Sequence, residues 1–477
     1  MGKQSAMAPT KASASETEII NGLVARARAA MESLVDATQE RVDEAVTALA
    51  WSLYKPERAK ALAEDAVEDT GLGSVSDKIT KNQRKTFGTL RDLLRVKTVG
   101  VIEEDRARGI VKYAKPVGVV AAITPSTNPA ATPVNKAMMA IKGRNATIIA
   151  PSPAGWNTTA RTVEFMRAEL DKTGLPADLV QVLPQPVSRT LTRGLMEACD
   201  LVVATGSQNN VRSAYGSGTP AIGVGTGNVP VIIDTNADLT DAAQKICTSK
   251  IFDNATSCSS ENSVIILDEI YDNAVNALKG AGGYLASVDE KKAIQSALWV
   301  DGKLNRKLIA KDAGVFAREV GLPESARRAR FFMVEDDGIG PEHPFSDEKL
   351  SLVLTVYRAR DFDAAVACTR DILNYVGRGH SCGIHTQNME HARRLAEEID
   401  VVRVLVNQAH TFGNGGGFDN GLNFTLSMGC GTWGGNSITE NLSYRHFINI
   451  THLCTLIPED RPSEEALFGT YWDRYGK

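Results

Sequence analysis

Between residues 115 and 235, short runs of apolar residues alternate with longer segments in which apolar residues recur at helical spacing. The short runs show no polar alternation, which is typical of strands buried on both faces of a parallel sheet. Strands are predicted at residues 116–125, 145–150, 180–184 and 201–205, and helices at 133–141, 158–172, 188–198 and from 211 onward. This alternation predicts a doubly wound α/β fold, in which ligands bind beyond the carboxyl ends of the strands.

The pattern on either side of this region extends the prediction. Residues 18–49 have apolar positions at helical spacing, and helix continues to residue 95, so a helical scaffold precedes the first sheet. The α/β texture returns later, with strands predicted at 231–234, 263–267, 349–357, 377–385 and 401–406 and helices from 238 and at 363–373 and 391–399. Residues 410–421 are predicted to form a long glycine-rich loop.

These changes in the pattern of apolar residues divide the chain into four predicted parts. A lead at residues 1–17, rich in Ala, Ser, Lys and Thr, is expected to be disordered. A first α/β domain follows at 18–235 and a second at 236–435, since 477 residues exceed what one compact domain usually holds. The segment 436–477 is expected to pair with another subunit.

Composition narrows the class of protein. Hydrophobic content is 43%, charged content is 23% and the net charge is -4, which gives no reason to expect nucleic acid or membrane binding. The seven cysteines are scattered and form no CxxC pair, so neither a disulfide framework nor a metal site is predicted. A reducing cytoplasm fits this cysteine usage.

Cys258 is the main candidate for chemistry. Small and polar residues surround it in segment 252–265, where Asp253 and Asn254 have the character of turn formers and a predicted strand follows. A cysteine on such a loop can act as a nucleophile, because a substrate can reach it and backbone N–H groups are close by. Taken alone, a free cysteine is more often a small buried apolar residue, so the other motifs have to decide.

Further motifs occur in a fixed order along the chain: residues 124–129 (TPSTNP), 223–230 (GVGTGNVP), 252–258 (FDNATSC), 348–351 (EKLS), 379–381 (GHS) and 429–436 (GCGTWGGN). Together they resemble the aldehyde dehydrogenase superfamily, and specifically its coenzyme A-acylating branch. The resemblance covers roughly residues 100–457. It implies a Rossmann-like cofactor domain at 18–235, a catalytic domain at 236–435 and an oligomerisation hairpin, in a homodimer or homotetramer.

The resemblance also assigns roles to individual residues. Cys258 matches the nucleophile, and Asn128 matches the residue whose amide stabilises the oxyanion. As an alternative, Asn128 before Pro129 simply forms a turn. Contacts with an NAD or NADP cofactor are implied for Ser152, Gly206, Ser207, Gly225 and Glu348.

One departure from the hydrolytic relatives is informative. Those relatives carry a glutamate at the start of the glycine-rich loop, where it activates water. Here the matching residue is Val224, or Gly223 if the loop is aligned one residue earlier, and neither is a base. Water has a pKa near 15.7 and a thiol one near 8.5, so a thiol acceptor needs much less help. This favours coenzyme A as the acyl acceptor, with His380 as candidate base for its thiol or, equally, as a structural histidine.

The cofactor and the aldehyde are less well defined by the sequence. Residues 150–153 follow the second strand and offer neither a carboxylate for the ribose of NAD nor a cation for NADP, so we expect NADP to be tolerated and slightly preferred. The loop at 407–417, Arg445 and His446 are candidates for holding an anionic aldehyde, or else form a solvated loop and an interface. The chain is similar to acylating enzymes that oxidise sulfoacetaldehyde.

Several alternatives stay open at this point. Acetaldehyde and succinate semialdehyde are the nearest rival substrates. A hydrolytic enzyme that releases a free acid is a second possibility, distinguished by its independence of coenzyme A. A catalytically inactive scaffold homologue is a third, and the presence of Cys258, Asn128 and Glu348 argues against it.

Overall fold

The computed structural model describes residues 12–477, and it begins with a layer of helices. These are α1 (Ala14–Met31), α2 (Gln39–Tyr54), α3 (Pro56–Thr70) and α4 (Val75–Leu94). The predicted disordered lead is wrong at its C-terminal end, because α1 begins at Ala14. Ser13 caps this helix and exchanges hydrogen bonds with Glu16 in a capping box, which satisfies two otherwise free N–H groups. Residues 1–11 lie outside the described part of the chain.

The first sheet has five parallel strands in the order β5-β4-β3-β6-β7. The strands are β3 (Val119–Ile123), β4 (Ala146–Ala150), β5 (Val180–Val182), β6 (Leu201–Ala204) and β7 (Ala221–Gly223). The helices between them are α5 (Ala131–Lys142), α6 (Trp156–Lys172), α7 (Arg189–Ala198) and α8 (Gln208–Tyr215). The chain changes direction across the sheet between β3 and β6, which opens a crevice at their carboxyl ends.

The second sheet has seven parallel strands in the order β10-β13-β14-β9-β8-β15-β16. The strands are β8 (Val229–Ile233), β9 (Glu261–Leu267), β10 (Gly283–Leu285), β13 (Phe331–Glu335), β14 (Val353–Ala359), β15 (Gly379–His385) and β16 (Val401–Val406). The helices are α9 (Leu239–Ile251), α10 (Tyr271–Gly280), α11 (Val288–Leu298), α12 (Ala313–Val320), α13 (Phe362–Tyr375), α14 (Met389–Glu398) and the short α15 (His410–Gly413), and β11 (Trp299–Val300) pairs with β12 (Lys303–Leu304).

The second half of strand β9, Val264 to Leu267, is continuously apolar for a structural reason. Val264 and Ile266 belong to the core on one face of the sheet, whereas Ile265 and Leu267 belong to the core on the other face. Side chains of a strand point alternately to its two faces, so a strand covered by helices on both sides needs apolar residues at every position. The predicted parallel α/β architecture is confirmed.

Two of the predicted boundaries differ in the structure, and strands β7, β10 and β13 were not predicted from the sequence. Strand β8 pairs with β9 and β15, so it belongs to the second sheet. The chain therefore enters this sheet at Val229, ahead of the boundary predicted at residue 235. Residues 349–352 are not part of the predicted strand, because Leu350 has a φ of 43° and β14 begins at Val353. The buried Lys349 ammonium instead donates hydrogen bonds to the carbonyls of Phe345 (2.6 Å) and Asp347 (3.1 Å), which stabilises this stretch as a loop.

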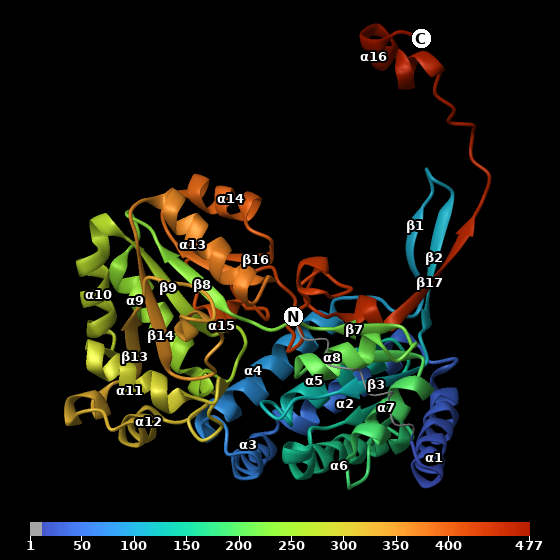
Figure 1. Cartoon of the computed structure of the whole chain (residues 1–477). Helices are drawn as coiled ribbons and strands as arrows, with labels where there is room; N and C mark the ends of the chain where they lie inside the picture. Colours follow the sequence, from blue (N-terminus) through green and yellow to red (C-terminus); the bar gives the residue numbers. More distant parts are fainter. Residues whose placement is uncertain (1–11) are drawn as a thin grey trace.

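A third, antiparallel sheet projects from the body of the molecule and leads to the C-terminal helix (Figure 1). It contains β1 (Gly100–Asp105), β2 (Ile110–Pro116) and β17 (Ile448–Cys454), followed by α16 (Glu464–Tyr475). Apolar side chains on this arm are exposed: Ile450, Leu453, Leu456, Ile457, Leu467 and Phe468. Among residues 12–477, no helix combines the length and the apolar character that crossing a membrane requires.

Candidate active site

Cys258 lies on the turn that connects the segment Phe252–Ala255 to β9. Asp253, Asn254 and Ala255 all have left-handed backbone conformations, with φ of 51°, 52° and 59°. Asp and Asn adopt this conformation more readily than most residues, which gives the predicted turn formers a physical reason. The run reverses the chain shortly before Cys258, which is half-buried as a residue while its thiol points into the protein.

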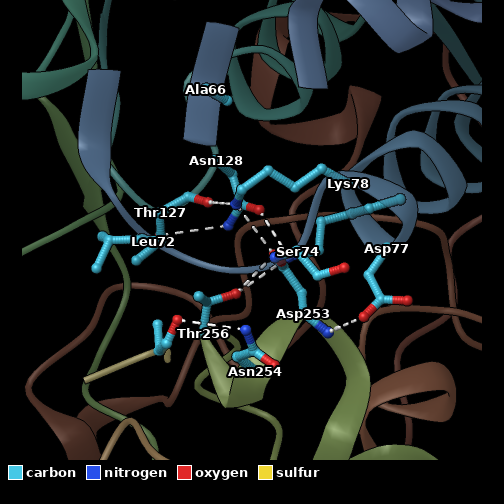
Figure 2. Close-up of polar contacts among 12 residues, drawn as sticks. Ala66, Leu72, Ser74, Asp77, Lys78, Thr127, Asn128, Asp253, Asn254 and Thr256 are labelled. Carbon is cyan, nitrogen blue, oxygen red and sulfur yellow. Dashed lines mark hydrogen bonds and ion pairs between the residues drawn. The ribbon is translucent and has the colours of Figure 1, made fainter. Parts of the chain in front are cut away.

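The side chain of Asp253 ties this turn to the N-terminal helices (Figure 2). Its Oδ1 accepts a hydrogen bond from the Ser74 N–H at 2.9 Å. Its Oδ2 forms ion pairs with Lys78, at 3.1 Å, and with Lys81, and accepts a hydrogen bond from Thr256 Oγ1 at 2.7 Å. All of these charged groups are buried, and the single carboxylate offsets part of the charge of the two ammonium groups away from solvent.

Lys81 also sets the orientation of Asn128. Its ammonium donates to Asn128 Oδ1 at 2.9 Å, and an ammonium can only donate, so this atom is the amide oxygen. The NH2 group of Asn128 contacts Thr127 Oγ1 at 3.3 Å, a long hydrogen bond. Both Asn128 and the neighbours of Cys258, Ser257 and Ser259, line one small cavity.

This cavity, which we call the acyl cavity, has a volume of about 40 Å³. A single water needs roughly 10–15 Å³ of such space, so the cavity suits a substrate of few heavy atoms. It is lined by Lys81, Arg84, Lys85, Asn128, Phe252, Ser257, Ser259, Thr411, Phe412, Gly415, Thr425, Leu426 and Met428. The wall therefore combines hydroxyl groups, aromatic rings and cationic side chains.

The glycine-rich loop at 223–230 packs directly on the nucleophile segment. A Cβ added to Gly227 would lie 1.9 Å from the carbonyl oxygen of Cys258, and one added to Gly225 would lie 2.8 Å from Cys430 Sγ. Only glycine permits these approaches. Val224 is buried in the same loop and carries no ionisable group. Gly225, predicted to contact the cofactor, thus lies against Cys430.

The electrostatic environment keeps the Cys258 thiol protonated in the free protein. Burial, and then the carboxylate of Glu348 and the thiol of Cys430, raise the pKa of Cys258 to about 12, while the Arg403 guanidinium opposes them. Burial also raises the pKa of Glu348 itself to about 8. Formation of the thiolate therefore requires a proton acceptor or a change of charge in the site, which substrate binding can supply.

Arg403 is a functional candidate that sequence analysis missed. It is buried on β16 and donates hydrogen bonds to Asn441 Oδ1 (3.0 Å), the His380 carbonyl (2.9 Å) and the Gly429 carbonyl (2.7 Å). Its charge lowers the pKa of Cys258 and so favours the thiolate. The sequence of β16 hides this role, because a single arginine in an otherwise apolar strand looks like a solvent-facing residue.

His380 does not have the near-neutral pKa expected of it. The ring is buried, and burial together with Arg403 and His410 lowers its pKa well below the usual value. Its Nδ1 shares a 2.8 Å hydrogen bond with Ser381 Oγ, which also contacts His410 Nε2 at 2.9 Å. His380 Nε2 has no hydrogen-bond partner within residues 12–477, and the residue does not line the acyl cavity.

A second, larger cavity of about 1190 Å³ opens at the carboxyl ends of β3 and β4 and reaches the start of α8. Two predicted cofactor residues line it: Ser152, and Ser207, which caps α8 by accepting a hydrogen bond from the Asn210 N–H at 3.3 Å. The N-terminus of a helix at a strand end is a suitable place for a pyrophosphate. Gly206 precedes this cap with a φ of 145°, which glycine adopts without strain.

Basic residues from parts of the chain other than residues 150–153 also reach this cavity. Arg189, Arg193, Arg212 and Arg306 line it, and no carboxylate from residues 12–477 does. These arginines come from α7, α8 and a distant loop, and none comes from the loop after β4. A dinucleotide therefore fits the cavity by volume, position and charge.

Comparison with known proteins places this geometry in a family. Residues 5–293 match the model of the aldehyde dehydrogenase family. The chain belongs to that family. The family prediction drawn from the motifs is thus confirmed, and so is the aldehyde dehydrogenase fold.

Several relatives in this family align with almost the whole length of the chain. The chain is 53% identical to the sulfoacetaldehyde dehydrogenase (acylating) of Cupriavidus necator, over 98% of this chain and 95% of the relative. It is 45% identical to the enzyme of the same name from Bilophila wadsworthia, over 94% and 98%. A solved acetylating aldehyde dehydrogenase from Geobacillus thermoglucosidasius is 34% identical, with a TM-score of 0.89 over 94% of this chain and 99% of that one.

The predicted site residues of this aldehyde dehydrogenase fall into separate groups. Asn128 lies in the acyl cavity beside the Cys258 turn, and Glu348 lies close enough to raise the thiol pKa. Ser152 and Ser207 line the second cavity. Arg445 and His446 do not line the acyl cavity: Arg445 is exposed, and His446 Nε2 contacts Glu440 Oε1 at 3.1 Å.

Proposed function

We propose that this protein is a coenzyme A-acylating aldehyde dehydrogenase that oxidises sulfoacetaldehyde to sulfoacetyl-coenzyme A with NADP or NAD. The observation that carries the proposal is the Cys258 turn beside a small cavity. The glycine-rich loop that packs on this turn has the buried Val224 where hydrolytic relatives have a glutamate. The sulfonated substrate is supported by the 53% identity to an acylating sulfoacetaldehyde dehydrogenase.

In the proposed first step, the Cys258 thiolate attacks the aldehyde carbon and forms a tetrahedral thiohemiacetal. Negative charge develops on the former carbonyl oxygen, and the NH2 group of Asn128 and the Cys258 N–H are the proposed donors to it. Lys81 supports this assignment by holding the amide oxygen of Asn128, which leaves the NH2 end for the oxyanion. Within residues 12–477 the Cys258 N–H donates no other hydrogen bond. A preorganised donor of this kind is worth about 10²–10³ in rate.

A bound nicotinamide would supply the hydride acceptor, and Cys258 would then carry the acyl group as a thioester. The cofactor residues we propose are Ser152, Gly206, Ser207, Gly225 and Glu348, with the first domain holding the dinucleotide and the second carrying the cysteine. Val224 cannot activate water, so the thioester persists until the thiol of coenzyme A attacks it. His380 remains the proposed base, although its lowered pKa makes it a weak one.

Succinate semialdehyde is a second candidate substrate. The chain is 40% identical to the succinate-semialdehyde dehydrogenase (acetylating) of Clostridium kluyveri, over 94% of this chain and 99% of the relative. The cationic wall of the acyl cavity suits a carboxylate as well as a sulfonate. A neutral aldehyde such as acetaldehyde gains nothing from this charge.

The proposal is tested by the formation of NAD(P)H from sulfoacetaldehyde, succinate semialdehyde and acetaldehyde, with and without coenzyme A. We expect strict dependence on coenzyme A and the highest kcat/KM with sulfoacetaldehyde. Full activity without any thiol would show that another group activates water. A clear preference for one of the other aldehydes would replace the substrate and leave the acylating reaction intact.

The arginines of the second cavity support a preference for NADP. Arg189 begins α7 and forms no ion pair within residues 12–477, so it is free to bind the 2′-phosphate. We expect Arg189→Ala to raise the KM for NADP about tenfold and to change the KM for NAD by less than about twofold, since only NADP loses a charge-assisted hydrogen bond. Initial rates with both cofactors measure this, and an equal loss for both would contradict the assignment.

We further propose a homodimer or homotetramer that assembles through the β1-β2-β17 sheet and α16. The exposed apolar residues of this arm support it, because isolated patches of this kind commonly mark contacts between subunits. All seven cysteines are free thiols, which supports a cytoplasmic location. Sedimentation analysis measures the assembly, and a monomer at micromolar concentration would exclude it.

A further inference from the structure

Helix α4 presents cationic side chains to the acyl cavity. Lys81, Arg84 and Lys85 all line it, and no carboxylate from residues 12–477 does. Lys81 already has an anionic partner, because it pairs with Asp253. Arg84 and Lys85 form no ion pair within residues 12–477, and the Asp419 carboxylate, which raises the pKa of Arg84, does not line the cavity. These two are therefore the cations that the cavity leaves without a paired anion.

The surroundings of Arg84 hold its guanidinium without neutralising it. Its polar contacts are long ones to the carbonyls of Gly416 (3.5 Å) and Phe412 (3.4 Å). Its carbon Cζ lies 5.2–5.4 Å from the ring centroids of Phe412, Phe418 and Phe424. Aromatic rings on several sides fix the position of this half-buried guanidinium, yet they supply no anion.

Lys85 is in a similar position. It donates one hydrogen bond, to the Gly415 carbonyl at 2.6 Å, and forms no ion pair within residues 12–477. Burial, and then the charges of Arg84 and Lys81, lower the pKa of Lys85 to about 7. Burial likewise lowers the pKa of Arg84. An anion placed between these groups would remove the repulsion and restore full charge on Lys85.

We propose that Arg84 and Lys85 form the anion subsite that selects a sulfonated or carboxylated aldehyde. The sulfonate lies against these two side chains, and the aldehyde carbon reaches Cys258 between Asn128 and Ser257. This assignment rests on the proposed function, since it names the residues that recognise the charged end of its substrate. It replaces Arg445 and His446, which lie outside the acyl cavity.

The first test compares sulfoacetaldehyde with propionaldehyde, a neutral aldehyde of similar size, in Arg84→Met and Lys85→Met. The ratio of kcat/KM for sulfoacetaldehyde to that for propionaldehyde is expected to fall about 10- to 100-fold, the scale of a lost hydrogen bond to a charged group. Arg84→Lys is expected to recover part of this ratio. Equal losses for both aldehydes would mean a structural role and would overturn the proposal.

Arg91→Met is the matched control. Arg91 lies on the same helix and packs on the same Phe418 and Phe424 rings, but it pairs with Asp92 and does not line the cavity. The ratio of the two aldehydes is expected to stay at its wild-type value in this variant. If Arg91→Met lowered the ratio as strongly as Arg84→Met, the loss would belong to the packing of α4 and the subsite would be refuted.

A second test does not depend on the identity of the natural substrate. Ethanesulfonate cannot be oxidised, and it is expected to inhibit propionaldehyde oxidation competitively, with Ki raised about tenfold or more by Arg84→Met. Absence of inhibition in the wild-type protein would overturn the subsite even if the acylating reaction holds. A rise in the KM for coenzyme A, with the aldehyde ratio unchanged, would assign the cations to coenzyme A phosphates and would also refute the proposal.

Discussion

Cys258→Ala is expected to reduce aldehyde oxidation by about 10⁴-fold or more, the scale of loss when a covalent nucleophile is removed. The alanine keeps the small size of the side chain, and Cys258 takes no part in the Asp253 network that holds the turn. The fold and the dinucleotide cavity should therefore survive. Steady-state NAD(P)H formation measures the loss, and titration of NADP by fluorescence shows whether the cavity remains intact.

Cys430→Ala is the control for this prediction. Cys430 lies in the same region, against Gly225 and under the influence of Arg403, but it is buried, whereas Cys258 is partly exposed and its neighbours Ser257 and Ser259 line the acyl cavity. Cys430→Ala should therefore keep most of the turnover, and Cys454→Ala, on the exposed arm, all of it. An inactive Cys430→Ala beside an active Cys258→Ala would reverse the assignment of the nucleophile.

Local patterns were sufficient for the α/β architecture. Four of the five strands of the first sheet lie within their predicted ranges, because a strand covered on both faces needs an unbroken apolar run. The short strand β7, which ends in a glycine, was not predicted. The errors occur where a side chain acts against the local pattern. The apolar run after Lys349 reads as strand, but the buried ammonium requires the nearby carbonyls and keeps this stretch a loop.

The candidate site was only partly accessible to sequence reasoning. Lys78, Lys81 and Lys85 recur at helical spacing and therefore share one face of α4, a signal present in the sequence. Such a face is usually solvated, and nothing local indicates that it meets a turn about 170 residues later in the chain. The arginines of the second cavity were missed for the same reason, because they converge from separate elements.

The second large effect expected is a loss of stability in Asp253→Asn, which removes the carboxylate that pairs with Lys78 and Lys81. We expect this change to lower the free energy of unfolding by about 3–5 kcal/mol, the usual cost of leaving buried charges without their partner. Lys78 and Lys81 would both lose the carboxylate with which they form ion pairs. Burial already lowers the pKa of Lys78 to about 8, so its charge depends on this partner. Asparagine accepts the left-handed conformation of residue 253, so the loss reports the charge rather than backbone strain.

Urea denaturation measures this loss, with Glu64→Gln as the matched carboxylate-to-amide control. Glu64 pairs with Lys60 at 3.9 Å on the exposed side of α3, where an ion pair is worth about 0.5 kcal/mol or less. Turnover should fall as well, because Lys81 links Asp253 to Asn128 and the Asp253 turn positions Cys258. If Asp253→Asn cost no more than Glu64→Gln, water would be solvating the two lysines. The coupling between α4 and the cysteine turn would then be refuted.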